Sequence, residues 1–210
     1  MNILIIGATG KTGRQLVKQS LEKGYTVTAL VRKPDKLKEQ HPNLIIVQGD
    51  VLDPASIDHV MPNQDAVLCA LGHKRFFLKT DILSKGTANI IHSMNTNGVR
   101  RLICITALGI NDSRYRLGLY YTLFTIPFIL YFYFRDKSRQ ERFIEESELD
   151  WTIIRPAQFI PGKKRSIYKH GHKVGHYILT KLITRADVAH FMLRELANPV
   201  YLNQKPGISY

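Results

Sequence analysis

The sequence has only two cysteines, Cys69 and Cys104, and both lie within apolar runs. A small secreted domain stabilised by disulfides contains many more cysteines, so this composition argues against such a scaffold. We expect both to be buried free thiols in a reducing compartment. The first residues already have the pattern of a strand, with no secretory leader before it, and we therefore expect a cytoplasmic protein.

Acidic residues are also scarce. There are 17 Asp and Glu against 30 Lys and Arg, which gives a formal net charge of +13. This balance favours anionic partners such as phosphate groups, nucleic acids or membrane surfaces. The sequence has no zinc-knuckle spacing, no interleaving of basic and aromatic residues and no recognition-helix pattern. We therefore predict that nucleic acid is not a partner.

The chain shows no internal repeat, low-complexity tract or linker, so we treat residues 1–210 as a single domain. Short apolar runs alternate with amphipathic stretches, which is typical of βαβ units and a parallel sheet. The predicted strands are Asn2–Ile6, Thr26–Val31, Leu44–Val47, Ala66–Ala70, Leu102–Thr106 and Trp151–Ile154. The predicted helices are Thr12–Lys23, Asp81–Asn97, Arg135–Glu146 and Arg185–Leu196. The expected fold is an α/β, doubly wound, Rossmann-type sheet with a small irregular C-terminal substrate lobe.

A glycine-rich segment, Gly7-Ala8-Thr9-Gly10-Lys11-Thr12-Gly13, follows the first strand and opens the first helix. Glycines there let the backbone approach a pyrophosphate, and the helix N-terminus supplies free N–H groups and a positive dipole end. A P-loop is excluded, because that motif needs a glycine five residues before Gly10 and Ile5 stands there. The alternative is a tight turn without a ligand. The predicted cofactor-binding residues of this segment are Gly7, Thr9, Gly10, Lys11, Thr12 and Gly13.

The ends of the next three strands extend the predicted cofactor site. Arg32 stands where an acidic residue would bind the ribose hydroxyls of NAD, so we predict NADP(H), with Arg32 on the 2′-phosphate. A solvated basic turn is the alternative. Asp50, beside Val51, either binds adenine or caps a turn. Ala70, Leu71 and Gly72 end the fourth strand at the same crevice.

Further segments make the chain resemble a known family. They are Gly86-Thr87-Ala88-Asn89, Thr106, Asp136-Lys137, Gln140-Glu141 and Asp150-Trp151-Thr152-Ile153-Ile154-Arg155-Pro156. Together with the glycine segment, Arg32 and Gly49-Asp50, they resemble the atypical short-chain dehydrogenase/reductases with an NmrA-like, NAD(P)H-binding domain. Within that family, the biliverdin reductase B/flavin reductase group is most similar. The resemblance implies NADPH binding and hydride transfer to a conjugated small-molecule acceptor such as a flavin, quinone or tetrapyrrole. Some relatives only sense NADP(H), which is the alternative.

Three residues are candidates for catalysis. Tyr133 and Lys137 have the Tyr-x-x-x-Lys spacing, which places both side chains on one face of a helix. An ammonium beside a phenol favours proton donation in carbonyl reduction, which gives a further alternative function. Thr106 is the candidate hydroxyl for orienting the acceptor. We also predict that Lys137 binds the cofactor, through a ribose hydroxyl. It matches the family's Lys-x-x-x-Glu spacing with Glu141, for which an ordinary helical ion pair is the alternative.

Two stretches have unusual composition. Leu117–Phe134 contains no charged residue, but Pro127 interrupts it and a membrane span there would split the sheet. We predict an apolar lid or a homodimer face, with peripheral membrane contact as the alternative. Residues of about 107–134 and 157–184 are the expected lid segments. The second contains His170, His172 and His176, for which we predict no metal because no Cys, Asp or Glu completes a ligand set.

Overall fold

The computed structural model describes residues 1–73 and 75–210, and its centre is an eight-stranded sheet. The strands are ordered β3-β2-β1-β4-β5-β6-β10-β8, and only β8 runs antiparallel to its neighbour. The first six strands are β1 (Asn2–Ile6), β2 (Thr26–Val31), β3 (Leu44–Gln48), β4 (Ala66–Cys69), β5 (Arg101–Ile105) and β6 (Asp150–Pro156). The order 3-2-1-4-5-6 is that of a dinucleotide-binding sheet. The predicted doubly wound fold is confirmed.

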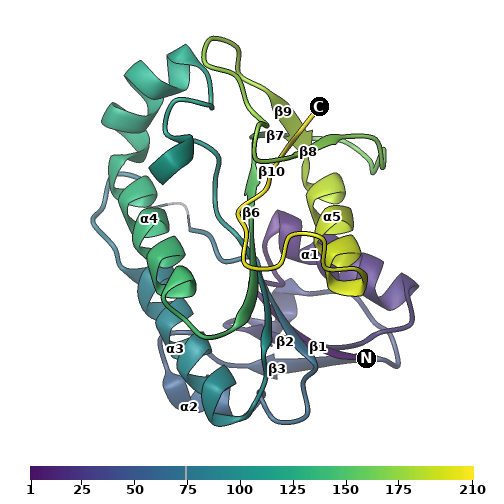
Figure 1. Ribbon diagram of the computed structural model, residues 1–210. Helices are drawn as coiled ribbons and strands as arrows, with labels where there is room; N and C mark the ends of the chain where they lie inside the picture. The colour runs from purple at the N-terminus through teal and green to yellow at the C-terminus, as the bar shows by residue number, and fades with distance from the viewer. Residues whose placement is uncertain (74) are drawn as a thin grey trace.

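Helices cover both faces of the sheet (Figure 1). One face carries α1 (Lys11–Glu22) and α5 (Arg185–Ala197), and the other carries α2 (Pro54–Asp58), α3 (Ile82–Thr96) and α4 (Tyr131–Glu145). In β1, Ile3 and Ile5 pack into the hydrophobic core on the face covered by α1 and α5. Leu4 and Ile6 pack into the core on the opposite face. A strand buried on both faces needs such an uninterrupted apolar run, which is why it was readable in the sequence.

The C-terminal part contains short strands that the sequence pattern did not predict. β7 (Gln158–Ile160) and β9 (Leu182–Thr184) form a separate parallel pair. β10 (Gly207–Ser209) and β8 (Lys169–Gly171) extend the main sheet beyond β6. Each has only three residues, too few for a periodicity to show.

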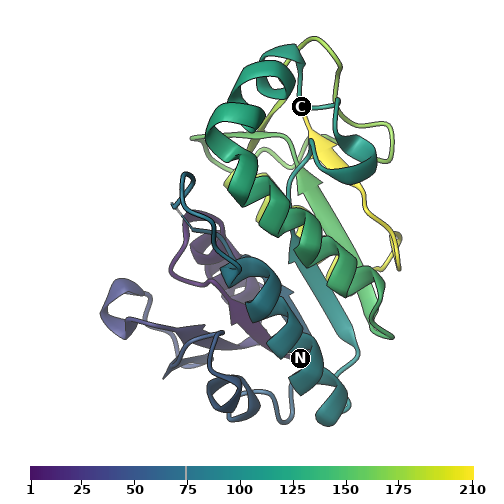
Figure 2. The same ribbon diagram turned by 90° about the vertical axis from the view of Figure 1, so that its left-hand side faces the viewer.

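The uncharged stretch is helical and continues into α4. Helical residues run from Leu119 through η3, a π-helical segment at Tyr121–Leu130, directly into α4. The helix predicted at Arg135–Glu146 therefore begins earlier than expected. Pro127 lies inside η3 and has no N–H to donate, which interrupts the α-helical hydrogen-bond pattern. Figure 2 shows this helix projecting past the end of the sheet. Within the described residues, no helix has the length and apolar character needed to cross a membrane.

Candidate functional site

Two glycines of the turn after β1, Gly7 and Gly13, have no room for a side chain. Gly7 has a φ of +83°, and a Cβ added there would lie 2.5 Å from the carbonyl oxygen of Ala70. A Cβ added at Gly13 would clash with the carbonyl oxygen of Gly7. Gly10 N donates to Gly7 O at 3.0 Å and closes the turn. The tight turn between β1 and α1 therefore requires glycine at positions 7 and 13, where a Cβ would overlap neighbouring backbone atoms.

The N-terminus of α1 has the features of an anion site. Its N-cap, Gly10, offers no side-chain cap, and the first turn contains no acidic residue. The first intrahelical bond here runs from Arg14 N to Gly10 O at 2.9 Å. The N–H groups of Lys11, Thr12 and Gly13 come before it and have no partner within the helix. Together with the positive end of the helix dipole, they fit the pyrophosphate of a dinucleotide.

Basic side chains lie beside this turn. Arg32 and Lys33 are exposed immediately after β2. Arg14 is a residue that the sequence argument missed. Its guanidinium donates to Thr9 O at 3.2 Å and to Lys36 O at 2.6 Å, so it lies between the glycine turn and the segment after β2. The available signal was its place directly after Gly13, on the exposed side of the first helical turn.

The segment after β3 is fixed by two hydrogen bonds and one close contact. Asp50 Oδ1 accepts from Leu52 N at 3.0 Å, so this side chain caps a turn, the alternative that the sequence left open. Val51 is buried, and a Cβ added at Gly86 on α3 would lie 2.8 Å from its Cγ2. Asn89 Nδ2 donates to Val51 O at 2.9 Å. The Gly86–Asn89 part of α3 therefore packs directly against the segment after β3.

Lys137 lies at the ends of β4 and β5 rather than beside Glu141. Its side chain is 1% exposed, and Nζ donates to Ile105 O at 2.8 Å, Gln140 Oε1 at 3.1 Å and Leu71 O at 3.2 Å. The ion pair between Lys137 and Glu141 weighed from the sequence is wrong, because the ammonium is directed to these carbonyl oxygens. Lys137 therefore joins the carboxyl end of β5 to the segment that follows β4.

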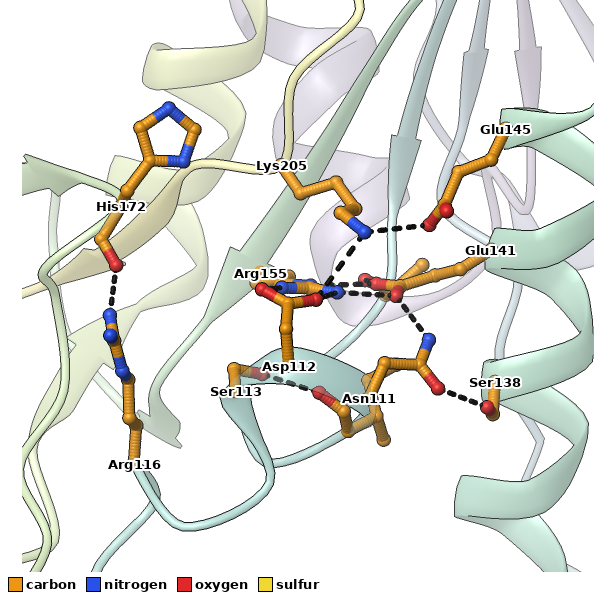
Figure 3. Close-up of polar contacts among 12 residues, drawn as sticks. Asn111, Asp112, Ser113, Arg116, Ser138, Glu141, Glu145, Arg155, His172 and Lys205 are labelled. Atoms are coloured by element: carbon orange, nitrogen blue, oxygen red, sulfur yellow. Dashed lines mark hydrogen bonds and ion pairs between the residues drawn. The ribbon is translucent and has the colours of Figure 1, made fainter.

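Glu141 instead pairs with Arg155, inside a buried network (Figure 3). Its carboxylate accepts from Arg155 Nε at 2.9 Å and Nη2 at 2.6 Å. It also accepts from Thr106 Oγ1 at 2.6 Å and Asn111 Nδ2 at 2.7 Å. The hydroxyl proton of Thr106 is therefore directed to Glu141, which leaves the Thr106 oxygen able to act only as an acceptor toward a ligand.

The network extends outward through Asp112, on the short helix η2 (Asn111–Ser113). Arg155 Nη1 and Nη2 donate to Asp112 at 2.9 and 2.8 Å. Lys205 Nζ lies 3.3 Å from Asp112 and 2.9 Å from Glu145. The hydrogen bonds from Arg155 hold the pKa of Asp112 well below its usual range, against the effect of partial burial. These contacts join β6, α4 and the segment after β5.

Tyr133 lies where the Tyr-x-x-x-Lys spacing predicted, on the same face as Lys137. Nζ of Lys137 is 5.9 Å from the centre of its ring. The ring also packs edge-on against His73 and Phe76, with centroids 4.9 and 5.5 Å away. A Cβ added at Gly72 would lie 3.4 Å from the Tyr133 hydroxyl. The hydroxyl is therefore beside the segment that follows β4.

Asp136 has a role that residue spacing could not reveal. It is 1% exposed and accepts from Leu83 N at 2.9 Å, Ser84 N at 3.0 Å and Ser84 Oγ at 2.5 Å. It caps the N-terminus of α3 from another helix, in place of Asp81, whose side chain makes no cap bond. Together with Lys137, Gln140 and Glu141, it fixes α4 against α3 and the end of β5.

The second predicted lid segment, residues 157–184, contains the three histidines considered for a metal site. Each of them has protein partners: His170 bonds to Tyr201 and Arg194, His172 bonds to Gln204, and His176 accepts from two backbone N–H groups. Within the described part of the chain, no group of three or more His, Cys, Asp or Glu residues is arranged to hold a metal.

Cys69 and Cys104 are buried free thiols on neighbouring strands, as predicted.

Comparison with known sequences identifies relatives of this chain. A profile described as NAD(P)H-binding matches residues 7–199. The photosystem II assembly factor Ycf39 of Synechocystis is 29% identical over 171 residues, which cover 77% of this chain and 46% of that protein. The chain spans about half the length of the first curated relatives that it matches.

Solved structures show the same fold. A short-chain dehydrogenase/reductase from Veillonella parvula, solved in complex with NADP, superposes with a TM-score of 0.82 at 16% identity, covering 100% of this chain and 94% of its own. ChuY of Escherichia coli O157:H7, an anaerobilin reductase, superposes with a TM-score of 0.81 at 20% identity, covering 100% and 97%. With the family profile spanning most of its length, the chain belongs to the NAD(P)H-binding family.

Proposed function

We propose that this protein is an NADPH-dependent oxidoreductase that transfers hydride to a conjugated acceptor such as a flavin, a quinone or a biliverdin-like tetrapyrrole. The observation that carries the proposal is the bare glycine turn with the uncapped N-terminus of α1, which lies next to the exposed Arg32. A reduced nicotinamide bound there supplies the hydride. Relatives named as reductases support the reaction class.

Different residues at the carboxyl ends of the strands bind different parts of the cofactor in this proposal. N–H groups of Lys11–Gly13 bind the pyrophosphate, and Arg32 binds the 2′-phosphate in a bidentate manner. The adenine lies beside Asp50-Val51. The nicotinamide end lies at Gly72, Thr106 and Lys137, which meet at the ends of β4 and β5.

The chain's part in the reaction is to position the two rings and to exclude water. Lys137 holds the ends of β4 and β5 in place, and the Thr106 oxygen can accept a hydrogen bond from the acceptor. The lid segments at about 107–134 and 157–184 cover the acceptor. A conjugated ring that receives the hydride can take its proton from solvent, so this reaction needs no general acid from the protein.

Two other functions remain as proposals with their own support. A protein that binds NADP(H) and regulates a partner is favoured by the relative named as an assembly factor. Carbonyl reduction is favoured by the Tyr133 hydroxyl, which lies beside Gly72 on the face that carries Lys137. The second alternative requires Tyr133 to donate a proton.

Replacement of Tyr133 by phenylalanine distinguishes the conjugated acceptor from a carbonyl. We expect Tyr133→Phe to leave NADPH oxidation by FMN, a quinone or biliverdin within a few-fold of wild type, because only a hydroxyl is removed. Steady-state loss of reduced nicotinamide measures the rate, and calorimetry measures NADPH affinity. A rate loss of about 10²–10⁴-fold with unchanged affinity is the effect of removing a general acid. It would show that Tyr133 donates the proton and would move the expected substrate class toward aldehydes and ketones.

A further inference from the structure

Two segments of the chain are basic and contain no acidic residue. Residues 113–135 and 157–186 have no Asp or Glu, although 17 occur in the whole chain. Their basic residues are Arg114, Arg116 and Arg135 in the first, and Lys163, Lys164, Arg165, Lys169, Lys173, Lys181 and Arg185 in the second. Such a segregation of charge favours an anionic partner.

The fold brings parts of these two segments together at one end of the molecule. Leu119 N donates to Ile178 O at 3.1 Å, and His176 N donates to Arg116 O at 2.9 Å. The Arg116 guanidinium donates to the carbonyl oxygen of His172 (Figure 3). The helix that continues into α4 and the loop before β9 thus lie together, beyond the carboxyl ends of the strands (Figures 1 and 2).

This end of the molecule also exposes many large apolar side chains. Phe128 is 75% exposed, Ile178 66% and Tyr120 63%, and none of the ten residues of η3 is buried. We call residues 115–131 and 176–182 the apolar cap. Its other exposed large apolar residues are Tyr115, Leu119, Leu123, Phe124, Ile129, Tyr131, Tyr177, Leu179 and Leu182. A large exposed apolar patch on a globular protein marks a surface that contacts another protein or a membrane.

Charge complementarity decides which body covers the apolar cap. The cap contains Arg116 and Lys181 and no Asp or Glu, so a second copy docked through the same face would bring like charges together, which is unfavourable. An anionic bilayer suits both properties of the cap, because its headgroups attract Lys and Arg while apolar side chains enter the boundary with the acyl chains. Tyrosine is enriched at this depth of a membrane, and the cap exposes Tyr115, Tyr120, Tyr131 and Tyr177.

We propose that the apolar cap docks this protein peripherally on the surface of an anionic membrane. The docked face lies beyond the carboxyl ends of the strands, and Gly72, just after β4, and the nearby Tyr133 hydroxyl belong to this same end of the molecule. The docking itself does not depend on the proposed reaction, and it would hold equally for a protein that only binds the cofactor.

Sedimentation with lipid vesicles tests the docking. We expect the full chain to bind vesicles of phosphatidylcholine mixed with phosphatidylglycerol, to bind phosphatidylcholine alone far more weakly, and to lose binding as salt rises. The double variant Phe128→Ser/Ile178→Ser should bind anionic vesicles about tenfold or more weakly, because two exposed apolar side chains are lost. NADPH affinity and circular dichroism check that its fold is intact.

A matched control uses exposed apolar residues at the opposite end of the sheet. Val200 and Leu202 are 58% and 42% exposed, near the start of β6. Val200→Ser/Leu202→Ser should bind vesicles as wild type does. The proposal is overturned if wild type binds neither vesicle at low salt, or if the cap variant binds as tightly as the control. A dimer in analytical ultracentrifugation that the cap variant abolishes, without vesicle binding by wild type, would show that a second copy covers the cap.

Discussion

Arg155→Met is expected to lower the free energy of unfolding by about 3–5 kcal/mol, because it leaves the Glu141 carboxylate buried without its cation. Glu141 is 0% exposed, and Arg155 supplies two of its four hydrogen bonds. Arg155 also ties Asp112 to β6, so the loop after β5 loses an attachment. Urea denaturation followed by circular dichroism measures the change.

An exposed ion pair provides the control for this prediction. Arg142 on α4 and Glu146, the C-cap of that helix, lie 3.1 Å apart, with side chains 73% and 59% exposed. Arg142→Met should cost less than about 1 kcal/mol, because solvent screens such pairs. The double variant Glu141→Leu/Arg155→Met should recover part of the loss, since no unpaired charge is then buried. A loss from Arg155→Met no larger than that from Arg142→Met would contradict the structural role given to the network.

The second large effect concerns the choice of cofactor. Arg32→Ala should weaken NADPH binding about 10- to 100-fold, because charge-assisted hydrogen bonds to a phosphate contribute about 1.5–3 kcal/mol. NADH lacks the 2′-phosphate, so its affinity should be weaker in wild type and unchanged in the variant. Isothermal titration calorimetry with both cofactors measures the two effects.

Arg100→Ala removes the same charge at the far end of the sheet, just before β5. It should leave both affinities close to wild type and thereby separates a specific contact from the general effect of net charge. Equal affinity of wild type for NADPH and NADH, or an Arg32→Ala variant that binds NADPH normally, would refute the assignment of NADP(H).

The sequence revealed the parts of the fold that have strong local patterns. β1, β2 and β4 are apolar runs buried on both faces, and the glycine turn between β1 and α1 is required by contacts within a few residues or with one neighbouring strand. The course of Leu117–Phe134 could not be predicted in the same way. Nearly every residue there is apolar, so no helical stripe distinguishes a helix from a loop.

The hydrogen-bond and ion-pair partners of individual side chains were less predictable from the sequence than the helices and strands. The four-residue spacing of Lys137 and Glu141 correctly placed both on one side of α4, but it could not show which distant groups compete for them. The Arg155 guanidinium, from β6, reaches Glu141 in a bidentate manner, while backbone carbonyl oxygens at the ends of β4 and β5 take the Lys137 ammonium. These contacts depend on how α4 packs against the sheet, which the spacing within one helix does not contain.

Acceptor-dependent oxidation of NADPH tests the central claim most directly. Purified protein is mixed with NADPH and then with FMN, a quinone or biliverdin, while the absorbance of the reduced nicotinamide is followed. The account predicts that at least one of these acceptors causes NADPH to be consumed at a rate proportional to protein concentration. NADPH that binds but is not consumed with any acceptor, together with a protein partner that co-purifies, would contradict it and identify a regulatory NADP(H)-binding protein.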